Sequence, residues 1–285
     1  MNVSRLQPWL RLIGQGAQVL RDAGVSSADV NARLLAEYIA GAQPEIAPDP
    51  DQYTIQRYDA AIAQRCAGIP LQHITGTMYF RYLELVSRPG CFIVRPETEL
   101  VAQAAIDAAR TALSVHGSAC VVDLCTGSGA IALSVATELP GTRVYGVEIS
   151  PEALAVATVN NAKYGSVVTL VRGDARTALP ELAHACDVVV ANPPYVPPTA
   201  NLPRDVVADP PLALWGGGKD GLELPRQLVA RAAHLLRPRG ILVMEHAEEQ
   251  GEALRSEALE TGFQSARTGV DLAGRARWLW AQWKD

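Results

Sequence analysis

Between residues 119 and 245, short apolar segments alternate with segments of helical periodicity, and this alternation limits the fold more than any other feature. Strands separated by helices favour a parallel sheet that is covered by helices on both faces. The sequence therefore predicts a doubly wound α/β fold. The predicted strands span 119–124, 143–148, 167–172, 187–191 and 240–245, with two more at 263–269 and 277–283.

The start of the chain has a different pattern, with apolar residues at helical spacing from Leu6 onward. Gly24 is a typical C-cap for the first predicted helix. Ser26 and Asp29 have the spacing of a capping box, which predicts the start of a second helix. A proline- and acid-rich loop follows, and a third helix is predicted to run through Cys66.

The boundary between these two patterns lies near residue 70. Residues 71–95 combine aromatic and aliphatic β-formers with a Pro-Gly pair, which predicts a hairpin linker. We therefore expect three parts: a helical docking domain at 1–70, the linker at 71–95, and the α/β domain at 96–285.

Composition narrows the functional class. The formal net charge of −5 and the pI of about 5.6 argue against a protein that binds duplex nucleic acid through a basic face. Five scattered cysteines without a CxxC pair argue against disulfides and a zinc site, and favour a reducing compartment. No signal-peptide core and no long apolar run is present, so we expect a cytoplasmic protein without a membrane span or a metal.

Three successive predicted strands end in acidic residues. Asp123 closes the first strand and is followed by a loop that contains Gly127 and Gly129 and then by a helix. Glycines allow close approach of a ligand, and a helix N-terminus offers free N–H groups. Glu148 closes the second strand, where a carboxylate can accept hydrogen bonds from a ribose diol. Asp174 follows the third strand, where it can accept a hydrogen bond from an adenine amino group.

The glycine loop alone also satisfies a relaxed dinucleotide fingerprint, so it leaves the cofactor open. Glu148 does not decide between a nicotinamide dinucleotide and S-adenosylmethionine, because both contain adenosine. Asp123 favours S-adenosylmethionine, because a carboxylate repels a pyrophosphate but attracts an ammonium and a sulfonium group.

The fourth predicted strand ends in Asn192-Pro193-Pro194-Tyr195. Two prolines hold this turn rigidly and provide no backbone donors. The Asn192 side-chain oxygen and the Pro193 carbonyl are then two acceptors for one planar NH2 group, and Tyr195 can pack flat on that group. Acceptors that strengthen as the nitrogen gains positive charge stabilise the transition state of methyl transfer. We therefore expect Asn192, Pro193 and Tyr195 to be catalytic and all four residues to bind substrate.

With these motifs the chain resembles the protein-(glutamine-N5) methyltransferases that modify peptide-chain release factors. The Asn-Pro-Pro-Tyr turn is shared with adenine-N6 methyltransferases and with ribosomal-protein glutamine methyltransferases. More specific motifs are "PLQHITG" (70–76), "RPETEL" (95–100), "DLCTGSGAIAL" (123–133), "EISPEALAVA" (148–157), "DPPLAL" (209–214), "KDGL" (219–222), "LVMEHAEEQ" (242–250) and "DLAGRAR" (271–277). The resemblance implies a Rossmann-like methyltransferase fold with S-adenosylmethionine as cofactor.

It also implies that the helical domain docks a release factor and that the turn binds the glutamine of its Gly-Gly-Gln loop. We expect a monomer that methylates this glutamine. A ribosomal-protein enzyme is the nearest alternative, followed by an adenine-N6 methyltransferase and a non-catalytic binding module. The residues predicted to bind the cofactor are Asp123, Cys125, Thr126, Gly127, Ser128, Gly129, Glu148, Asp174, Ala175 and Asn192.

The chain departs from the family pattern in two places. Cys125 replaces a glycine of the cofactor loop, which puts close approach of the ligand at that residue in doubt. Residues 216–218 contain one glycine more than the usual spacing, in a segment that we expect near the substrate.

Overall fold

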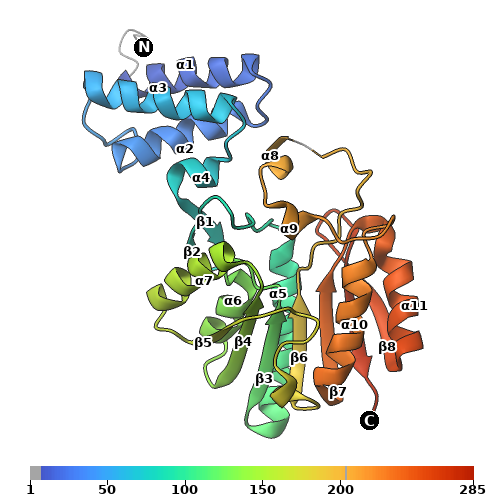
Figure 1. The fold of residues 1–285 in the computed structure, drawn as a ribbon. Helices are drawn as coiled ribbons and strands as arrows, with labels where there is room; N and C mark the ends of the chain where they lie inside the picture. The colour runs from blue at the N-terminus through green and yellow to red at the C-terminus, as the bar shows by residue number, and fades with distance from the viewer. Residues whose placement is uncertain (1–7, 203) are drawn as a thin grey trace. The chain divides into compact units, whose positions relative to one another are not determined.

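The computed structural model describes residues 8–202 and 204–285, which form two compact units (Figure 1). The described part of the first unit contains residues 8–77 and 204–208. The second unit contains residues 78–202 and 209–285. Among the described residues, no helix is long and apolar enough to cross a membrane.

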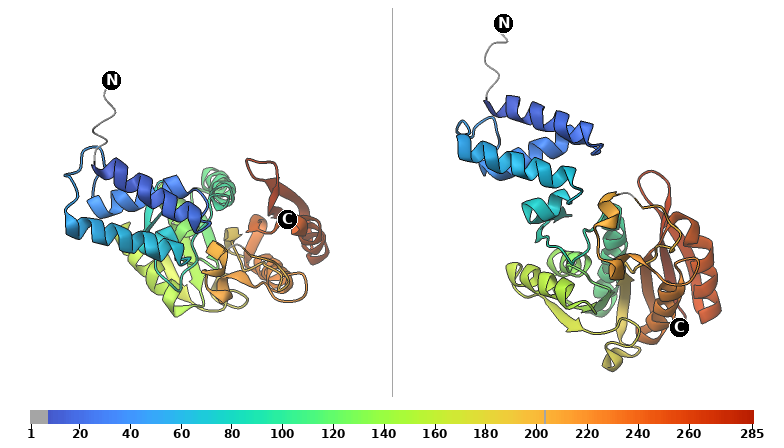
Figure 2. Two further views of the ribbon diagram at one scale, coloured as in Figure 1. Left: turned by 90° about the horizontal axis from the view of Figure 1, so that it is seen from above. Right: turned by 45° about the horizontal axis from the view of Figure 1, so that its top comes forward.

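The first unit is a group of helices around a small apolar core. Figure 2 shows three of them side by side. Trp9, Leu20, Leu35 and Tyr58 fill the core, and the two aromatic rings meet edge to face. The helices of this unit are α1 (Pro8–Asp22), α2 (Ala28–Ala40), α3 (Gln52–Cys66), α4 (Leu71–Thr75) and α8 (Arg204–Val207).

The predicted capping box at the start of α2 is wrong. Ser27 occupies the N-cap position in a left-handed conformation and makes no side-chain capping bond. The Asp29 carboxylate instead forms an ion pair with the Arg21 guanidinium of α1, at a distance of 2.9 Å. Leu6, which the prediction placed in the first helix, lies outside the described residues.

A short hairpin opens the second unit and is formed by β1 (Thr77–Phe80) and β2 (Leu83–Val86). The sequence predicted this hairpin but not the preceding helix α4. Arg81 lies in the two-residue turn, and its guanidinium pairs with Glu138 at 2.6 Å. This ion pair ties the hairpin to α6 (Ala130–Glu138).

The second unit is built on a seven-stranded sheet in the order β5-β4-β3-β6-β7-β9-β8. Strands β3 to β7 pair in parallel, as predicted, whereas β9 runs antiparallel to both β7 and β8. The predicted doubly wound sheet is confirmed, and β9 alone departs from parallel pairing, because a short turn joins β8 to β9 and permits only antiparallel pairing. The strands are β3 (Ala119–Leu124), β4 (Thr142–Glu148), β5 (Val168–Arg172), β6 (Cys186–Ala191), β7 (Leu236–Glu245), β8 (Phe263–Val270) and β9 (Ala276–Trp283).

Helices cover both faces of this sheet (Figure 1). On one face α5 and α6 pack against Val121, Val188 and Val190, while on the other α10 and α11 pack against Val122 and Val189. Because side chains alternate along each strand, they pack into two separate apolar cores, one on each face of the sheet. The remaining helices are α5 (Thr98–His116), α7 (Pro151–Lys163), α9 (Pro211–Leu214), α10 (Glu223–Leu235) and α11 (Gly251–Thr261), with short 3-10 turns at Pro180–Leu182 and Glu248–Gln250.

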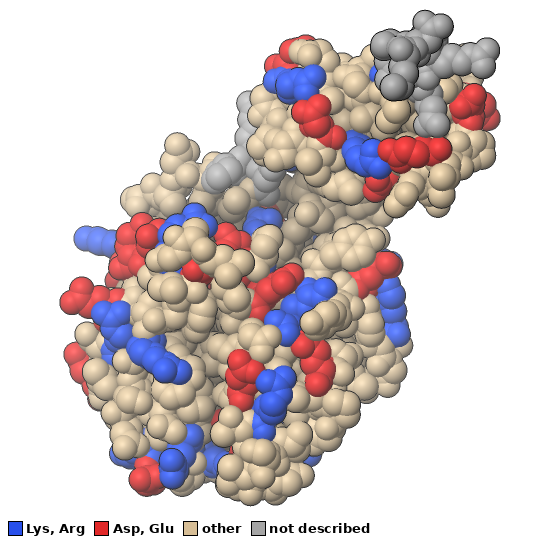
Figure 3. All heavy atoms as spheres, turned by 180° about the vertical axis from the view of Figure 1, so that it is seen from behind, with Lys and Arg blue, Asp and Glu red and all other residues tan. Residues whose placement is uncertain are grey.

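Surface charge is mixed on the face that Figure 3 shows. Lysine and arginine alternate there with aspartate and glutamate, and neither sign forms a continuous patch. Charges elsewhere on the described surface are paired, as in Lys163 with Glu84 at 2.8 Å and Arg226 with Asp220 at 3.0 Å. This face therefore lacks the basic surface that binding to a phosphate backbone requires.

Candidate active site

The parallel register brings the carboxyl ends of five strands to one edge of the sheet. Leu124 at the end of β3 pairs with Val147 of β4 and with Ala191 of β6. Ala191 in turn pairs with Met244 of β7. The predicted residues Asp123, Glu148, Asp174 and Asn192 therefore lie along this edge, where open α/β sheets bind their ligands.

Asp123 is a fully buried carboxylate at this edge. Its Oδ2 accepts hydrogen bonds from the Thr126 hydroxyl at 2.6 Å and from the Ala132 backbone N–H at 3.2 Å. The other oxygen, Oδ1, is buried with no hydrogen-bond partner among the described residues. Burial raises the pKa of Asp123 to about 7. A buried carboxylate with one free oxygen is a costly feature that a cationic ligand would stabilise.

The glycine loop is held against β4 by Glu148. One oxygen of this carboxylate accepts from the Gly127 N–H and the other from the Ser150 N–H, both at 2.8 Å. Each oxygen keeps a second lone pair for a ligand hydroxyl. Gly127 has φ +58°, and nothing lies within 4 Å of the position that a Cβ would take, so its open side can receive a ligand. Burial raises the pKa of Glu148.

Cys125 departs from the glycine pattern at a cost to the backbone. Its φ is +63°, in the left-handed region that glycine adopts without strain. Burial raises the pKa of its thiol, and the charges of Glu148, Asp123 and Asp174 raise it further. The thiol therefore stays protonated near neutral pH.

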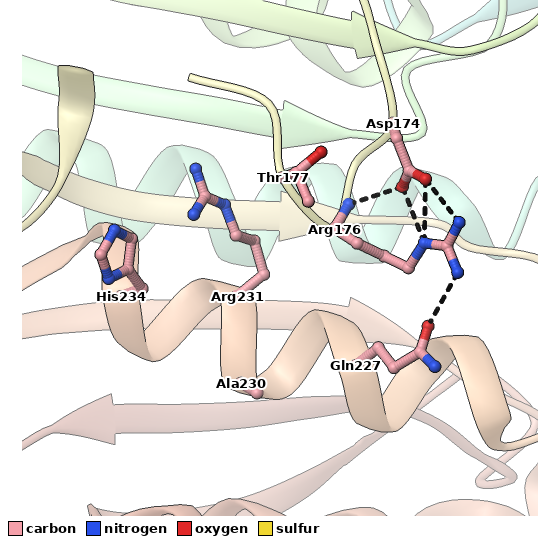
Figure 4. A pocket seen from close by; sticks show the side chains of 7 residues that line it. All are labelled: Asp174, Arg176, Thr177, Gln227, Ala230, Arg231 and His234. Atoms are coloured by element: carbon pink, nitrogen blue, oxygen red, sulfur yellow. Dashed lines mark hydrogen bonds and ion pairs between the residues drawn. The ribbon is translucent and has the colours of Figure 1, made fainter. Parts of the chain in front are cut away.

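Asp174 is engaged differently from the other two acids. Both of its oxygens accept hydrogen bonds from the Arg176 guanidinium, and Arg176 also reaches Gln227 of α10 (Figure 4). The bond to Arg176 lowers the pKa of Asp174. This carboxylate therefore faces an open cleft beside α10 as one half of an ion pair. The cleft is lined by Asp174, Arg176, Thr177, Gln227, Ala230, Arg231 and His234, as Figure 4 shows.

The other predicted cofactor residues follow the same loop and strand ends. Thr126 and Ser128 are buried, and Ala175 packs in the core behind Asp174. Gly129 adopts a left-handed conformation at the N-cap of α6. The loop thus turns the chain from β3 into that helix with its backbone near the sheet edge.

Asn192 is oriented by a residue far away in the sequence. Its side-chain Nδ2 donates a hydrogen bond to the hydroxyl of Thr98, the first residue of α5, at 3.2 Å. With the NH2 end of the amide turned toward Thr98, the Oδ1 end points the other way. The asparagine can therefore present an acceptor on that side.

Tyr195 is anchored through its hydroxyl as well as its ring. The hydroxyl donates to Oε1 of Glu245, the last residue of β7, at 3.1 Å. The Tyr195 carbonyl accepts from the Gln250 side chain at 2.8 Å, and the same amide also donates to Asp220. The turn is thus fixed at both ends of this residue.

The glycine-rich segment after α9 packs directly on this turn. A Cβ on Gly216 would lie 1.9 Å from the Gly221 carbonyl oxygen, and one on Gly221 would lie 2.2 Å from the Tyr195 oxygen. Both positions therefore require glycine. Gly217 and Gly218 have positive φ and turn the chain between them.

Sequence reasoning missed three residues that support the turn: Thr98, Glu245 and Gln250. Each lies in a quoted motif, but its role depends on a partner that is distant along the chain. The one available signal was Glu245 itself, because it closes a strand as Glu148 does. Among the described residues, no group of three or more His, Cys, Asp or Glu is arranged to hold a metal ion.

Comparison with known proteins identifies the class. Residues 121–203 match a family model described as a methyltransferase domain. The structure is similar to a Thermus thermophilus 16S rRNA methyltransferase solved with S-adenosylmethionine and guanosine, with a TM-score of 0.51 and 22% identity over 73% of this chain and 50% of that one. It is also similar to the catalytic domain of hMettl16, with a TM-score of 0.53, 15% identity and 82% coverage of both chains. The fold and the matched domain define an S-adenosylmethionine-dependent methyltransferase.

More similar relatives define the family within this class. Residues 11–76 match the PrmC N-terminal domain. The chain is 47% identical to a release factor glutamine methyltransferase of Streptomyces coelicolor, over 95% of this chain and 96% of the relative. It is 40% identical to that of Bifidobacterium longum, over 95% and 98%. The chain therefore belongs to the release factor glutamine methyltransferase family.

Proposed function

We propose that this enzyme transfers a methyl group from S-adenosylmethionine to the side-chain N5 of the glutamine in the Gly-Gly-Gln loop of a peptide-chain release factor. The observation that carries the proposal is the orientation of Asn192, whose NH2 group is bound to Thr98 so that its oxygen is free to accept. The names of relatives up to 47% identical over nearly the full length support the same substrate.

The cofactor would lie along the edge formed by Asp123, the glycine loop and Glu148. The unpartnered Oδ1 of Asp123 fits a cationic amino acid end. Glu148 fits a ribose diol, because it closes β4 beside the open side of Gly127. Asp174 would bind an adenine amino group while keeping its bond to Arg176.

The chemistry requires a weak nucleophile to react. S-adenosylmethionine, when bound, supplies a methyl group on a sulfonium that is ready to leave. The glutamine nitrogen would form the new N–C bond as the C–S bond breaks, with the demethylated thioether as leaving group, and one proton would then pass from the nitrogen to water. Asn192 Oδ1 and the Pro193 carbonyl would each accept one N–H, and both bonds strengthen as positive charge develops on the nitrogen. Tyr195 would pack on the amide plane and exclude water.

The N-terminal unit would dock another part of the release factor. Its helix α2 exposes Val30, Leu34 and Tyr38 at a spacing of four residues, which places them on one face. Exposed apolar side chains in a row on one helix are typical of a protein contact. Removal of residues 1–70 should weaken methylation of the factor while cofactor binding persists.

The decisive test is incubation with labelled S-adenosylmethionine and a purified release factor, followed by mass mapping of the modified residue. We expect one methyl group on the Gly-Gly-Gln glutamine and none on a factor with asparagine at that position. Asn192→Ala should lower the single-turnover rate roughly 100- to 1000-fold. Labelling of a ribosomal protein in place of the factor, or of the asparagine-substituted factor, would contradict the proposal.

A further inference from the structure

Glu245 is a buried carboxylic acid beside the catalytic turn, and the proposed chemistry does not use it directly. It closes β7, next to Asn192 at the end of β6, and only 2% of it is exposed. Oε1 accepts from the Tyr195 hydroxyl, while Oε2 is buried with no hydrogen bond of standard geometry from the described residues. Such a group is costly to bury, so its presence calls for a function.

Two hydroxyl groups connect this acid to the turn. The Tyr195 hydroxyl donates a hydrogen bond to it directly, and the Thr98 hydroxyl interacts with the same carboxyl and lowers its pKa. Thr98 is fully buried and also accepts the hydrogen bond from Asn192. Glu245 thus lies at one end of a chain of side chains whose other end is the asparagine.

An ionised Glu245 favours one direction of the hydrogen bonds along this chain. A carboxylate only accepts, so the single proton of the Thr98 hydroxyl is directed to Glu245. The Thr98 oxygen is then left as an acceptor, and Asn192 can turn only its NH2 group toward it. A protonated Glu245 could instead donate to Thr98, which would allow the hydroxyl to donate to Asn192 and reverse the amide.

We propose that Glu245 is a positioning residue, which acts through Thr98 to fix the Asn192 amide with its oxygen toward the substrate nitrogen and through Tyr195 to fix the ring. The inference rests on the proposed function, because an acceptor is needed there only if the substrate presents an NH2 group. An unfixed amide would present its own NH2 group for part of the time and repel the substrate.

The proposal predicts a dependence on pH. Burial raises the pKa of Glu245 to about 7, the charge of Glu97 raises it further, and the two hydroxyls and Arg277 oppose this. Burial also lowers the pKa of His246, so this imidazole is neutral near pH 7. Below pH 7 the acid gains its proton, and the amide is no longer fixed. The titratable and charged groups that act on Glu245 from the neighbouring elements are Glu97, Tyr195 and Arg277.

The test compares Glu245→Gln, Thr98→Val and Thr98→Ser with the wild type. We expect kcat for release-factor methylation to fall about 10- to 100-fold in Glu245→Gln and Thr98→Val, with KM and the cofactor Kd little changed. Thr98→Ser keeps the hydroxyl and should restore most of the rate. The acid limb of the wild-type kcat profile near pH 7 should vanish in Glu245→Gln. Glu249→Gln, an exposed acid just beyond the same strand, is the matched control and should behave as the wild type.

Two outcomes would overturn the proposal. One is an unchanged kcat in both Glu245→Gln and Thr98→Val; the other is a Thr98→Ser variant as slow as Thr98→Val, which would mean that packing and not polarity matters. If Glu245→Gln does not fold, the two Thr98 variants decide. The side-chain amide signals of Asn192 in NMR spectra need no substrate and should shift in Thr98→Val. If the wild type fails to methylate the factor, the proposed function fails, whereas the NMR comparison still tests the positioning.

Discussion

Replacing Asp123 with asparagine should move the stability of the free enzyme and its affinity for S-adenosylmethionine in opposite directions. Burial raises the pKa of this carboxyl from 3.8 to about 7, which corresponds to about 4 kcal/mol of cost to the folded state when it is ionised. The substituted side chain would keep an acceptor for Thr126 and Ala132 but place its NH2 group where Oδ1 now has no partner, at a cost of about 1–3 kcal/mol. The expected net gain in unfolding free energy is about 1–3 kcal/mol, or several degrees in Tm.

The size of this gain in unfolding free energy depends on pH. A carboxyl whose pKa is raised in the folded state costs nothing below its unfolded pKa of 3.8 and its full penalty above about 7. The stabilising effect of Asp123→Asn should therefore be complete at pH 8 and disappear toward pH 4. Affinity for the cationic cofactor should fall roughly 100- to 1000-fold at pH 8, since a charge pair at about 4 Å contributes about 4 kcal/mol at an effective dielectric constant of 20.

Thermal unfolding with and without cofactor, and calorimetric titration with S-adenosylmethionine, measure both effects. Asp187 is the matched control, because it is buried on β6 but accepts from the Cys120 N–H at 2.8 Å and pairs with Arg237 at 2.6 Å. Asp187→Asn should destabilise the protein and leave the cofactor Kd unchanged. An Asp123→Asn protein that is less stable at pH 8 and binds cofactor normally would refute the reasoning and make Asp123 a structural cap of its loop.

Three further changes test the turn and its supports. Cys125→Gly should relieve the left-handed strain and leave the unfolding free energy equal or up to about 1 kcal/mol higher, whereas Cys125→Val should lower it. Denaturant melts in which both variants lose the same unfolding free energy would argue against strain at this residue. Gly221→Ala should lower the unfolding free energy by about 1–3 kcal/mol and lower kcat, because the new methyl group would clash with the Tyr195 carbonyl. Gly274→Ala is the control: this glycine has a similar φ and nothing lies within 4 Å of the new methyl group, so the loss of stability should be smaller and kcat unchanged. Tyr195→Phe should lower kcat less than Tyr195→Ala does, but it should raise the pKa of Glu245, so that the acid limb of the pH profile of kcat moves to higher pH. An acid limb that does not move would show that the Tyr195 hydroxyl does not act on Glu245.

The sequence by itself determined the elements of the larger unit and the order of residues at its ligand-binding edge. Periodicity and local composition act within a few residues, so the ends of β3, β4 and β6, at or next to which Asp123, Glu148 and Asn192 lie, could be predicted from the sequence pattern alone. The parallel register then follows from the intervening helices. The hydrogen-bond acceptors of the turn at Asn192 could be inferred from the local sequence, because two prolines restrict its backbone.

The tertiary structure decided what depends on distant partners. The bond from Asn192 to Thr98 joins residues 94 positions apart, and that from Tyr195 to Glu245 joins residues 50 apart. Which hydroxyl lies beside which carboxyl is set by how α5 and β7 pack on β6, and no local pattern records that. Asp174 differs from these two residues, because its partner Arg176 lies only two positions further along the chain. Side-chain polarity at the turn is therefore a property of the packed sheet edge, because each donor is fixed by an acceptor that only the fold brings near.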